Sequence, residues 1–185
     1  PLIVGQNDSN ESPLSYGQQA LWFLHQLLPE EISFNVAGAV RILGDLDTLA
    51  LERAFNQLTA RHESLRSTFH VLNGEPIQQA HDSMKGIFQI IDASNLNDSD
   101  LREQLAIEAH LPFDLENNSA VRALLFKRNN EYILLLAMDH IVTDFRSMTV
   151  LAREVLASYE ANKNVKEISL PSLTARYSDY VRWQR

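Results

Sequence analysis

The stretch "VRALLFKRNNEYILLLAMD", residues 121–139, decides the fold, because two long apolar runs are separated in it by a short polar turn. Apolar runs on both sides of such a turn are typical of an antiparallel β-hairpin. Residues 121–128 and 132–139 are apolar on both faces, and strands of that kind lie inside a sheet. The sequence therefore predicts a sheet with this hairpin in its interior and other strands on either side of it.

Shorter patterns predict more strands and several helices around this hairpin. Branched and aromatic runs predict strands at residues 34–43 and 87–91, and two short strands within 67–80 that turn at Asn73-Gly74. Apolar residues at helical spacing predict helices over residues 15–28, 47–61, 101–109, 145–159 and 170–185. Helices and strands are intermixed, which favours an α/β chain of the α+β type, with a mixed β-sheet covered by helices.

Composition restricts the class of protein. With 185 residues and 45% hydrophobic content the chain can bury a core of its own, and we expect one domain. The net charge is −8 and the basic residues are scattered among acids, so we expect neither nucleic acid nor a membrane as a partner. The chain has no cysteine, which excludes a disulfide framework, a thiolate zinc site and a cysteine nucleophile.

The N-terminal stretch and the apolar runs bear on location. The longest apolar run, residues 132–138, is far shorter than the roughly 20 residues that cross a bilayer, and the start has no signal-peptide pattern. We therefore expect a soluble, cytoplasmic protein. Residues 1–12 are predicted to be a linker, with structure from Pro13 onward. Because the first residue is Pro1 and not methionine, we expect the chain to have been cut from a longer protein.

Charged and titratable side chains gather at the end of the second hairpin strand, in "MDHIVTDFRS" (138–147). Side chains alternate along a strand, so Met138 and His140 are predicted on one face and Asp139 on the other. Asp139 and His140 therefore point apart and form no simple Asp-His dyad. A carboxylate on the apolar face needs a partner, and we expect Asp139 to pair with an arginine such as Arg66.

His140 has two interpretations. It ends a strand just before a loop, where the sheet fixes the backbone and the loop gives access, and its ordinary pKa suits a general base near neutral pH. The alternative is a half-buried histidine bonded to a backbone carbonyl. Asp144 is expected to cap the helix that begins near Phe145. A metal site of Asp139, His140 and Asp144 is a further hypothesis, although the spacing matches no common ligand pattern.

Three other stretches, together with residues 138–147, resemble a known family in their order along the chain. They are "SYGQQALWFL" (15–24), "RHESLRSTF" (61–69) and "YSDYVRWQR" (177–185). Together the four stretches are similar to the first four core motifs of the condensation domains of non-ribosomal peptide synthetases. "PFDLENNSAVRALLF" (112–126) also resembles the segment that precedes the active-site strand in that family. The resemblance extends from Pro13 to Arg185.

The third family motif is His-His-x-x-x-Asp-Gly, and residues 139–145 here are Asp-His-Ile-Val-Thr-Asp-Phe. The resemblance implies that His140 is the catalytic histidine and Asp144 the structural aspartate. Asp139 replaces the first histidine, and Phe145 replaces the glycine. A phenylalanine at that place is expected to narrow the substrate passage or to demand a different backbone turn.

A second family shares part of this motif. Asp139, Asp144 and Ser147 satisfy the Asp-x-x-x-x-Asp-x-x-Ser signature of the related heterocyclization domains. His140 is retained, however, and the second and fourth motifs resemble those of ordinary condensation domains. Heterocyclization therefore stays open as an alternative.

The resemblance implies the chloramphenicol acetyltransferase-like fold, in which two similar lobes enclose a tunnel. Residues 13–185 would be the N-terminal lobe, with the C-terminal lobe missing. In the complete domain, an acyl or peptidyl thioester and an aminoacyl thioester are joined through an amide bond. Upstream and downstream carrier proteins present them on phosphopantetheine arms. The chemistry implies no directly bound cofactor and no metal.

The two departures from the motif leave the activity open. The alternative to an active domain is a catalytically degenerate platform that docks carrier proteins or a tailoring enzyme. We expect the isolated lobe to catalyse nothing, because its partner lobe is missing. A lone lobe also exposes apolar surface through which it can associate.

Overall fold

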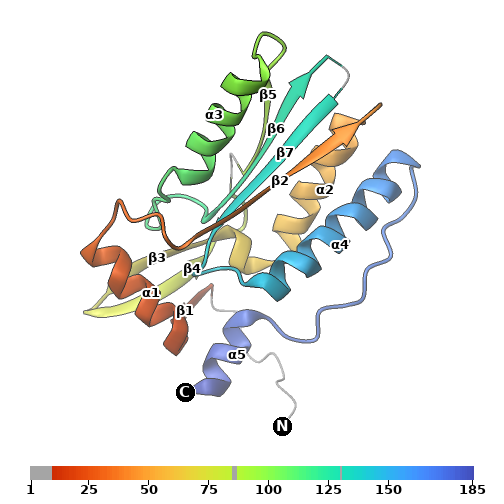
Figure 1. Cartoon of the computed structure of the whole chain (residues 1–185). Helices are drawn as coiled ribbons and strands as arrows, with labels where there is room; N and C mark the ends of the chain where they lie inside the picture. Colours follow the sequence, from red (N-terminus) through yellow and green to blue (C-terminus); the bar gives the residue numbers. More distant parts are fainter. Residues whose placement is uncertain (1–9, 85–86, 130) are drawn as a thin grey trace.

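The computed structural model describes residues 10–84, 87–129 and 131–185. Its main sheet has the strand order β2-β7-β6-β5 (Figure 1). Strands β6 (Val121–Arg128) and β7 (Glu131–Asp139) form the antiparallel hairpin in the middle. Strand β2 (Asn35–Leu43) is antiparallel to β7, and β5 (Phe88–Asp92) is parallel to β6. The predicted interior hairpin and the mixed sheet are both confirmed, although Glu131 belongs to β7 and the predicted turn residue Asn130 lies outside the described residues.

Helices cover both faces of this sheet. Helices α2 (Thr48–Arg61) and α4 (Phe145–Lys163) pack on one face, and α3 (Asp98–His110) packs on the other (Figure 1). The first face buries Met138 and its neighbours against α2 and α4, and the opposite face buries Leu135 against α3. The period-2 alternation predicted for the second hairpin strand is therefore confirmed along β7.

A second, smaller sheet has the order β1-β4-β3. Strands β3 (Ser67–Leu72) and β4 (Glu75–Ala80) form the second predicted hairpin, and the 3-10 turn η1 (Glu63–Arg66) connects α2 to β3. Asn73 and Gly74 have φ of 52° and 86°, as a tight hairpin turn of this kind requires. Strand β1 (Glu11–Pro13) pairs with β4, so ordered structure begins before the predicted Pro13. In the rest of the predicted linker, Asn10 is described and residues 1–9 lie outside the described residues.

Helices α1 (Tyr16–Leu27) and α5 (Tyr177–Gln184) meet beside the small sheet (Figure 1). Trp22 of α1 packs against Phe69 of β3 and belongs to the same hydrophobic cluster as Ala137 of β7, so α1 joins the two sheets. The last helix was predicted to start at residue 170, and this start is wrong. Helix α5 begins at Tyr177, after an extended segment. Pro171 has no backbone N–H and disfavours a helical residue before it, which fits an extended approach. Within the described part of the chain, none of the helices is both long and apolar enough to cross a membrane.

Candidate active site

The backbone at the end of β7 is held from both sides. The N–H of Asp139 donates to the carbonyl of Ala120 at 2.9 Å, and the N–H of His140 donates to the carbonyl of Phe34 at 2.9 Å. These bonds attach the strand end to the entry of β6 and to the residue before β2. The loop of residues 140–143, which leads into α4, therefore starts from a fixed point.

Asp139 turns into the protein body. Its side chain is 8% exposed, and its Oδ1 accepts a hydrogen bond of 2.8 Å from the N–H of Ile141. Burial raises the pKa of the Asp139 carboxyl, and the hydrogen bond from Ile141 and the nearby His25 and His140 only partly oppose this. The carboxylate is thus satisfied by the loop's own backbone.

The predicted ion pair between Asp139 and Arg66 is wrong. The guanidinium of Arg66 donates to the carbonyl of His81, and the N–H of His81 donates to the carbonyl of Arg66 at 2.9 Å. Arg66 sits where η1 passes into β3, and His81 follows the paired strand β4. Arg66 is therefore bonded to the end of the small sheet and not to Asp139 of β7.

His140 is exposed, in contrast to its neighbour. Its Nδ1 is hydrogen-bonded to the carbonyl oxygen of Thr143. A carbonyl can only accept, so Nδ1 carries a proton, and a ring with its one proton at Nδ1 has an acceptor lone pair on Nε2. The bond to a backbone carbonyl expected of a structural histidine is therefore present, but the ring is exposed and not half-buried.

A cavity of about 300 Å³ opens beside His140. The loop supplies Ile141, Val142 and Thr143, the start of α4 supplies Ser147, and α1, η1 and α5 each add lining residues. Those from the three other elements are Gly17, Gln18, Leu21, Ser64 and Tyr177. All three of the other stretches that carry the resemblance, at residues 15–24, 61–69 and 177–185, thus contribute to the cavity beside His140.

Three of these lining residues, Gln18, Ser64 and Tyr177, were not singled out from the sequence. Gln18 had a visible signal, because Ser15-x-x-Gln18 is a capping-box pattern and both of its bonds are present at the start of α1. Ser64 and Tyr177 lie in the quoted stretches 61–69 and 177–185, but neither residue had a signal of its own. Only the tertiary fold brings them to the cavity.

Asp144 caps α4, as predicted. Its Oδ1 accepts from both the N–H and the hydroxyl of Ser147, each at 2.6 Å. The hydroxyl and then the N–H of Ser147 lower the pKa of the Asp144 carboxyl, and it is exposed. The Asp144–Ser147 spacing is thereby used for helix capping.

Phe145 begins α4 with its side chain 89% exposed. Among the described residues other than glycine, only Asn73 and Val165 have positive φ, so Phe145 has an ordinary backbone conformation. A phenylalanine at this place therefore needs no left-handed backbone. Its bulk stands at the start of α4, next to a residue that lines the His140 cavity.

The predicted metal hypothesis finds no geometric support in residues 10–84, 87–129 and 131–185. No group of three or more metal-ligating side chains converges there. Asp139 points inward to Ile141, and Asp144 is engaged by Ser147. The proposed ligands are therefore directed to different partners.

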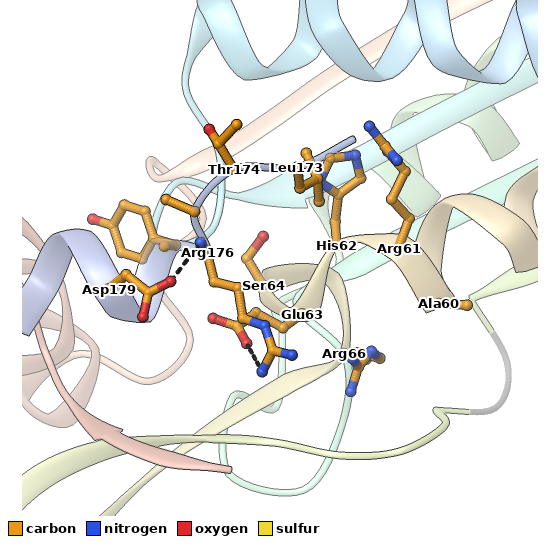
Figure 2. Close-up of a pocket in the computed structure, with 12 residues that line it drawn as sticks. Ala60, Arg61, His62, Glu63, Ser64, Arg66, Leu173, Thr174, Arg176 and Asp179 are labelled. Atoms are coloured by element: carbon orange, nitrogen blue, oxygen red, sulfur yellow. Dashed lines mark hydrogen bonds and ion pairs between the residues drawn. The ribbon is translucent and has the colours of Figure 1, made fainter. Parts of the chain in front are cut away.

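A second cavity, of about 520 Å³, adjoins the first, since Ser64 and Tyr177 line both (Figure 2). Its wall is polar. The carboxylate of Glu63 accepts from the N–H of Ser178 at 3.2 Å and lies 3.8 Å from the guanidinium of Arg176. Asp179 accepts from the N–H of Arg176 at 2.9 Å. The polar cavity at the end of η1 therefore shares two lining residues, Ser64 and Tyr177, with the cavity beside His140.

Comparison with known proteins gives the family. The condensation domain family model matches residues 8–185. The chain belongs to the condensation domain family. It is 40% identical over 190 residues to a linear gramicidin synthase chain of Brevibacillus parabrevis, and 36% identical over 186 residues to a dimodular nonribosomal peptide synthase of Bacillus subtilis (strain 168). These alignments cover all of this chain but only 2% and 8% of the two synthases.

Solved condensation domains share the fold. The X-domain in a complex with OxyB from teicoplanin biosynthesis superimposes with a TM-score of 0.89 at 29% identity, over 99% of this chain and 40% of that one. The first condensation domain of the calcium-dependent antibiotic synthetase gives a TM-score of 0.83 at 21% identity, over 95% of this chain and 43% of that one. This condensation domain chain therefore has the chloramphenicol acetyltransferase-like fold, and it spans about two fifths of the solved domains that it matches.

Proposed function

We propose that the chain is the N-terminal lobe of a non-ribosomal peptide synthetase condensation domain that forms amide bonds, with residues 13–185 as the lobe. In the complete domain the reactants are an acyl or peptidyl thioester and an aminoacyl thioester. Upstream and downstream carrier proteins deliver both on phosphopantetheine arms, and the C-terminal lobe supplies the other wall of the tunnel. The synthases among the relatives support this assignment.

One observation carries the proposal: His140 stands exposed beside a cavity, with Nδ1 bonded to the Thr143 carbonyl and Nε2 left for a substrate. An acceptor there can take a proton from the attacking amine, or hold the amine by accepting its N–H as it approaches the thioester carbonyl. The amine nitrogen forms the new bond to carbon, the carbon–sulfur bond breaks, and the proton leaves with the thiol. Holding two tethered reactants together supplies much of the acceleration.

Amide formation is favoured here over heterocyclization. The hydroxyl of Ser147 is committed to Asp144 as part of the α4 cap, and Asp139 faces inward. The Asp139, Asp144 and Ser147 pattern thus has a structural explanation that needs no cyclization chemistry.

The test uses the full-length parent synthetase with both carrier proteins loaded, and amide product measured by mass spectrometry. His140→Ala should lower the single-turnover rate by about a hundredfold or more, which is the usual scale of a general-base contribution. His110→Ala is the matched control, because His110 is also exposed and its Nδ1 also bonds a backbone carbonyl, that of Ala106 at 2.6 Å. A His140→Ala rate equal to that of the control would reject the catalytic role.

A second candidate function is a degenerate platform for carrier proteins or a tailoring enzyme. It is favoured by the likeness to the X-domain in its complex with OxyB and by Asp139 in place of the family histidine. On this hypothesis the parent forms no amide with any loaded carrier pair, and His140→Ala changes no product. Product formation by the wild-type domain would decide for the enzyme.

A further inference from the structure

The peptide groups on both sides of Ile141 are held by buried side chains. The N–H of Ile141 donates to Oδ1 of Asp139 at 2.8 Å, and its carbonyl accepts from Nε2 of Gln18 at 3.2 Å. Asp139 is 8% exposed and Gln18 only 3% exposed. Ile141 directly follows His140, so these two bonds fix the loop next to the imidazole.

Gln18 is itself held by the start of α1. Its Oε1 accepts from the N–H of Ser15 at 3.1 Å, and its backbone N–H donates to the hydroxyl of Ser15 at 3.2 Å. The Ser15 hydroxyl also lies 2.9 Å from the hydroxyl of Tyr177 on α5. The amide of Gln18 therefore has one end in a capping box and the other end on the His140 loop.

We propose that Gln18 is a positioning residue for His140: its amide N–H holds the Ile141 carbonyl and thereby fixes where the imidazole stands relative to the attacking amine. The inference rests on the proposed function. A loop that carries a catalytic group must be held to a fraction of an ångström, since small displacements cost large factors in rate. Gln18 touches no reacting atom in this scheme and acts through the loop alone.

A purely structural role for Gln18 is separable from positioning. In Gln18→Glu the carboxylate can still accept from the N–H of Ser15, because Ser-x-x-Glu is also a capping box. It has no N–H to give to the Ile141 carbonyl, and its negative oxygen would face that carbonyl. The helix start is retained while the contact with the His140 loop is lost.

The neighbouring Gln19 offers the matched control. Its Nε2 donates to the carbonyl of Leu14 at 3.1 Å, which is also a side-chain bond to backbone at the same helix start. It makes no hydrogen bond to the described loop of residues 140–143. Gln19→Glu thus also replaces a side-chain amide by a carboxylate, but at a residue that is not bonded to Ile141.

The experiment measures kcat and KM for the aminoacyl carrier protein in the full-length parent. Gln18→Glu should lower kcat by between about tenfold and a hundredfold with KM within about twofold of wild type, whereas Gln19→Glu should leave both within about twofold. Gln18→Met, which buries no charge, is the second variant in case Gln18→Glu fails to fold, and it should also lower kcat. Thermal unfolding verifies that each variant is folded.

Three outcomes are distinguishable. A kcat loss in both Gln18 variants and not in Gln19→Glu supports positioning. Wild-type kcat in a folded Gln18 variant, or an equal loss in Gln19→Glu, overturns it. If His140→Ala in the same assay is as fast as wild type, the proposed function itself has failed, which a failure of the Gln18 inference alone does not produce.

Discussion

Two aspartates stand on either side of His140 and make the same kind of bond, yet their surroundings are opposite. Asp139 at the end of β7 accepts from the N–H of Ile141, and Asp144 at the start of α4 accepts from the N–H of Ser147. Asp139 is 8% exposed and its pKa is raised, chiefly by burial. Asp144 is exposed and its pKa is lowered, chiefly by the Ser147 hydroxyl.

The difference teaches that the local hydrogen bond does not decide the sign of the pKa shift. At Asp144 water and the donors of Ser147 both favour the charged carboxylate. At Asp139 the apolar side of β7 removes water, and one backbone donor does not make up the loss. The same residue type therefore stabilises the fold at one end of the loop and costs free energy at the other.

The largest expected effect comes from adding a second buried carboxylate at the residue next to Asp139, on the other face of β7. Met138 is fully buried on the opposite face of β7, where it packs among apolar side chains. Met138→Asp places a carboxylate there without an N–H donor and should lower the free energy of unfolding by on the order of 3–5 kcal/mol. Met138→Leu, as the control, should cost less than about 1.5 kcal/mol. Denaturant unfolding of the complete domain measures both, and equal stability of the two variants would contradict the account.

A smaller effect is expected at the exposed aspartate. Asp144→Ala removes the N-cap of α4 and should lower the free energy of unfolding by about 0.5–2 kcal/mol at pH 7, while Asp144→Ser, which keeps a capping oxygen, should lose less. Because the folded pKa of Asp144 is depressed, its contribution is present above the ordinary aspartate pKa of about 4 and is lost as pH falls through the folded pKa. Unfolding curves between pH 7 and pH 3 test this. A loss that grows in acid would be inconsistent with capping by the carboxylate.

The smallest effect, with the opposite sign, is expected at the buried aspartate. Asp139→Asn keeps an oxygen for the N–H of Ile141 and removes the charge. At pH 8 the free energy of unfolding should therefore rise by on the order of 1 kcal/mol, which raises Tm by a few degrees at most. Because the folded pKa of Asp139 is raised, ionisation opposes folding above that pKa, and the gain should fade as pH falls through it. Calorimetry at several pH values measures the gain. A lower Tm at pH 8, or a gain that increases in acid, would contradict the account.

Most of the fold was predictable because its signals are local. The interior position of the hairpin followed from its two apolar faces, and the turn at Asn73-Gly74 followed from its residue types. The short strand β1 was missed, since Glu11–Pro13 has no pattern of its own and is defined by its pairing with β4. The start of α5 was placed too early for a similar reason, because the apolar spacing continues into an extended segment.

The candidate site was predictable only in part. The divergence of Asp139 and His140 followed from strand alternation, and the cap at Asp144 followed from its place before a helix. The partner of Asp139 did not follow, because a donor two residues along the loop depends on how the loop turns. The bond from Gln18 to Ile141 joins residues 123 positions apart, and no local pattern encodes such a contact.

The exposed, ordinary helical start at Phe145 has a consequence for the side chains that position 145 of this chain can hold. Since the backbone there needs no glycine and the ring contributes little to the core, the position tolerates many side chains with almost no penalty to folding. Evolution or a protein engineer can then alter the size of the group at this point while the scaffold beneath stays intact.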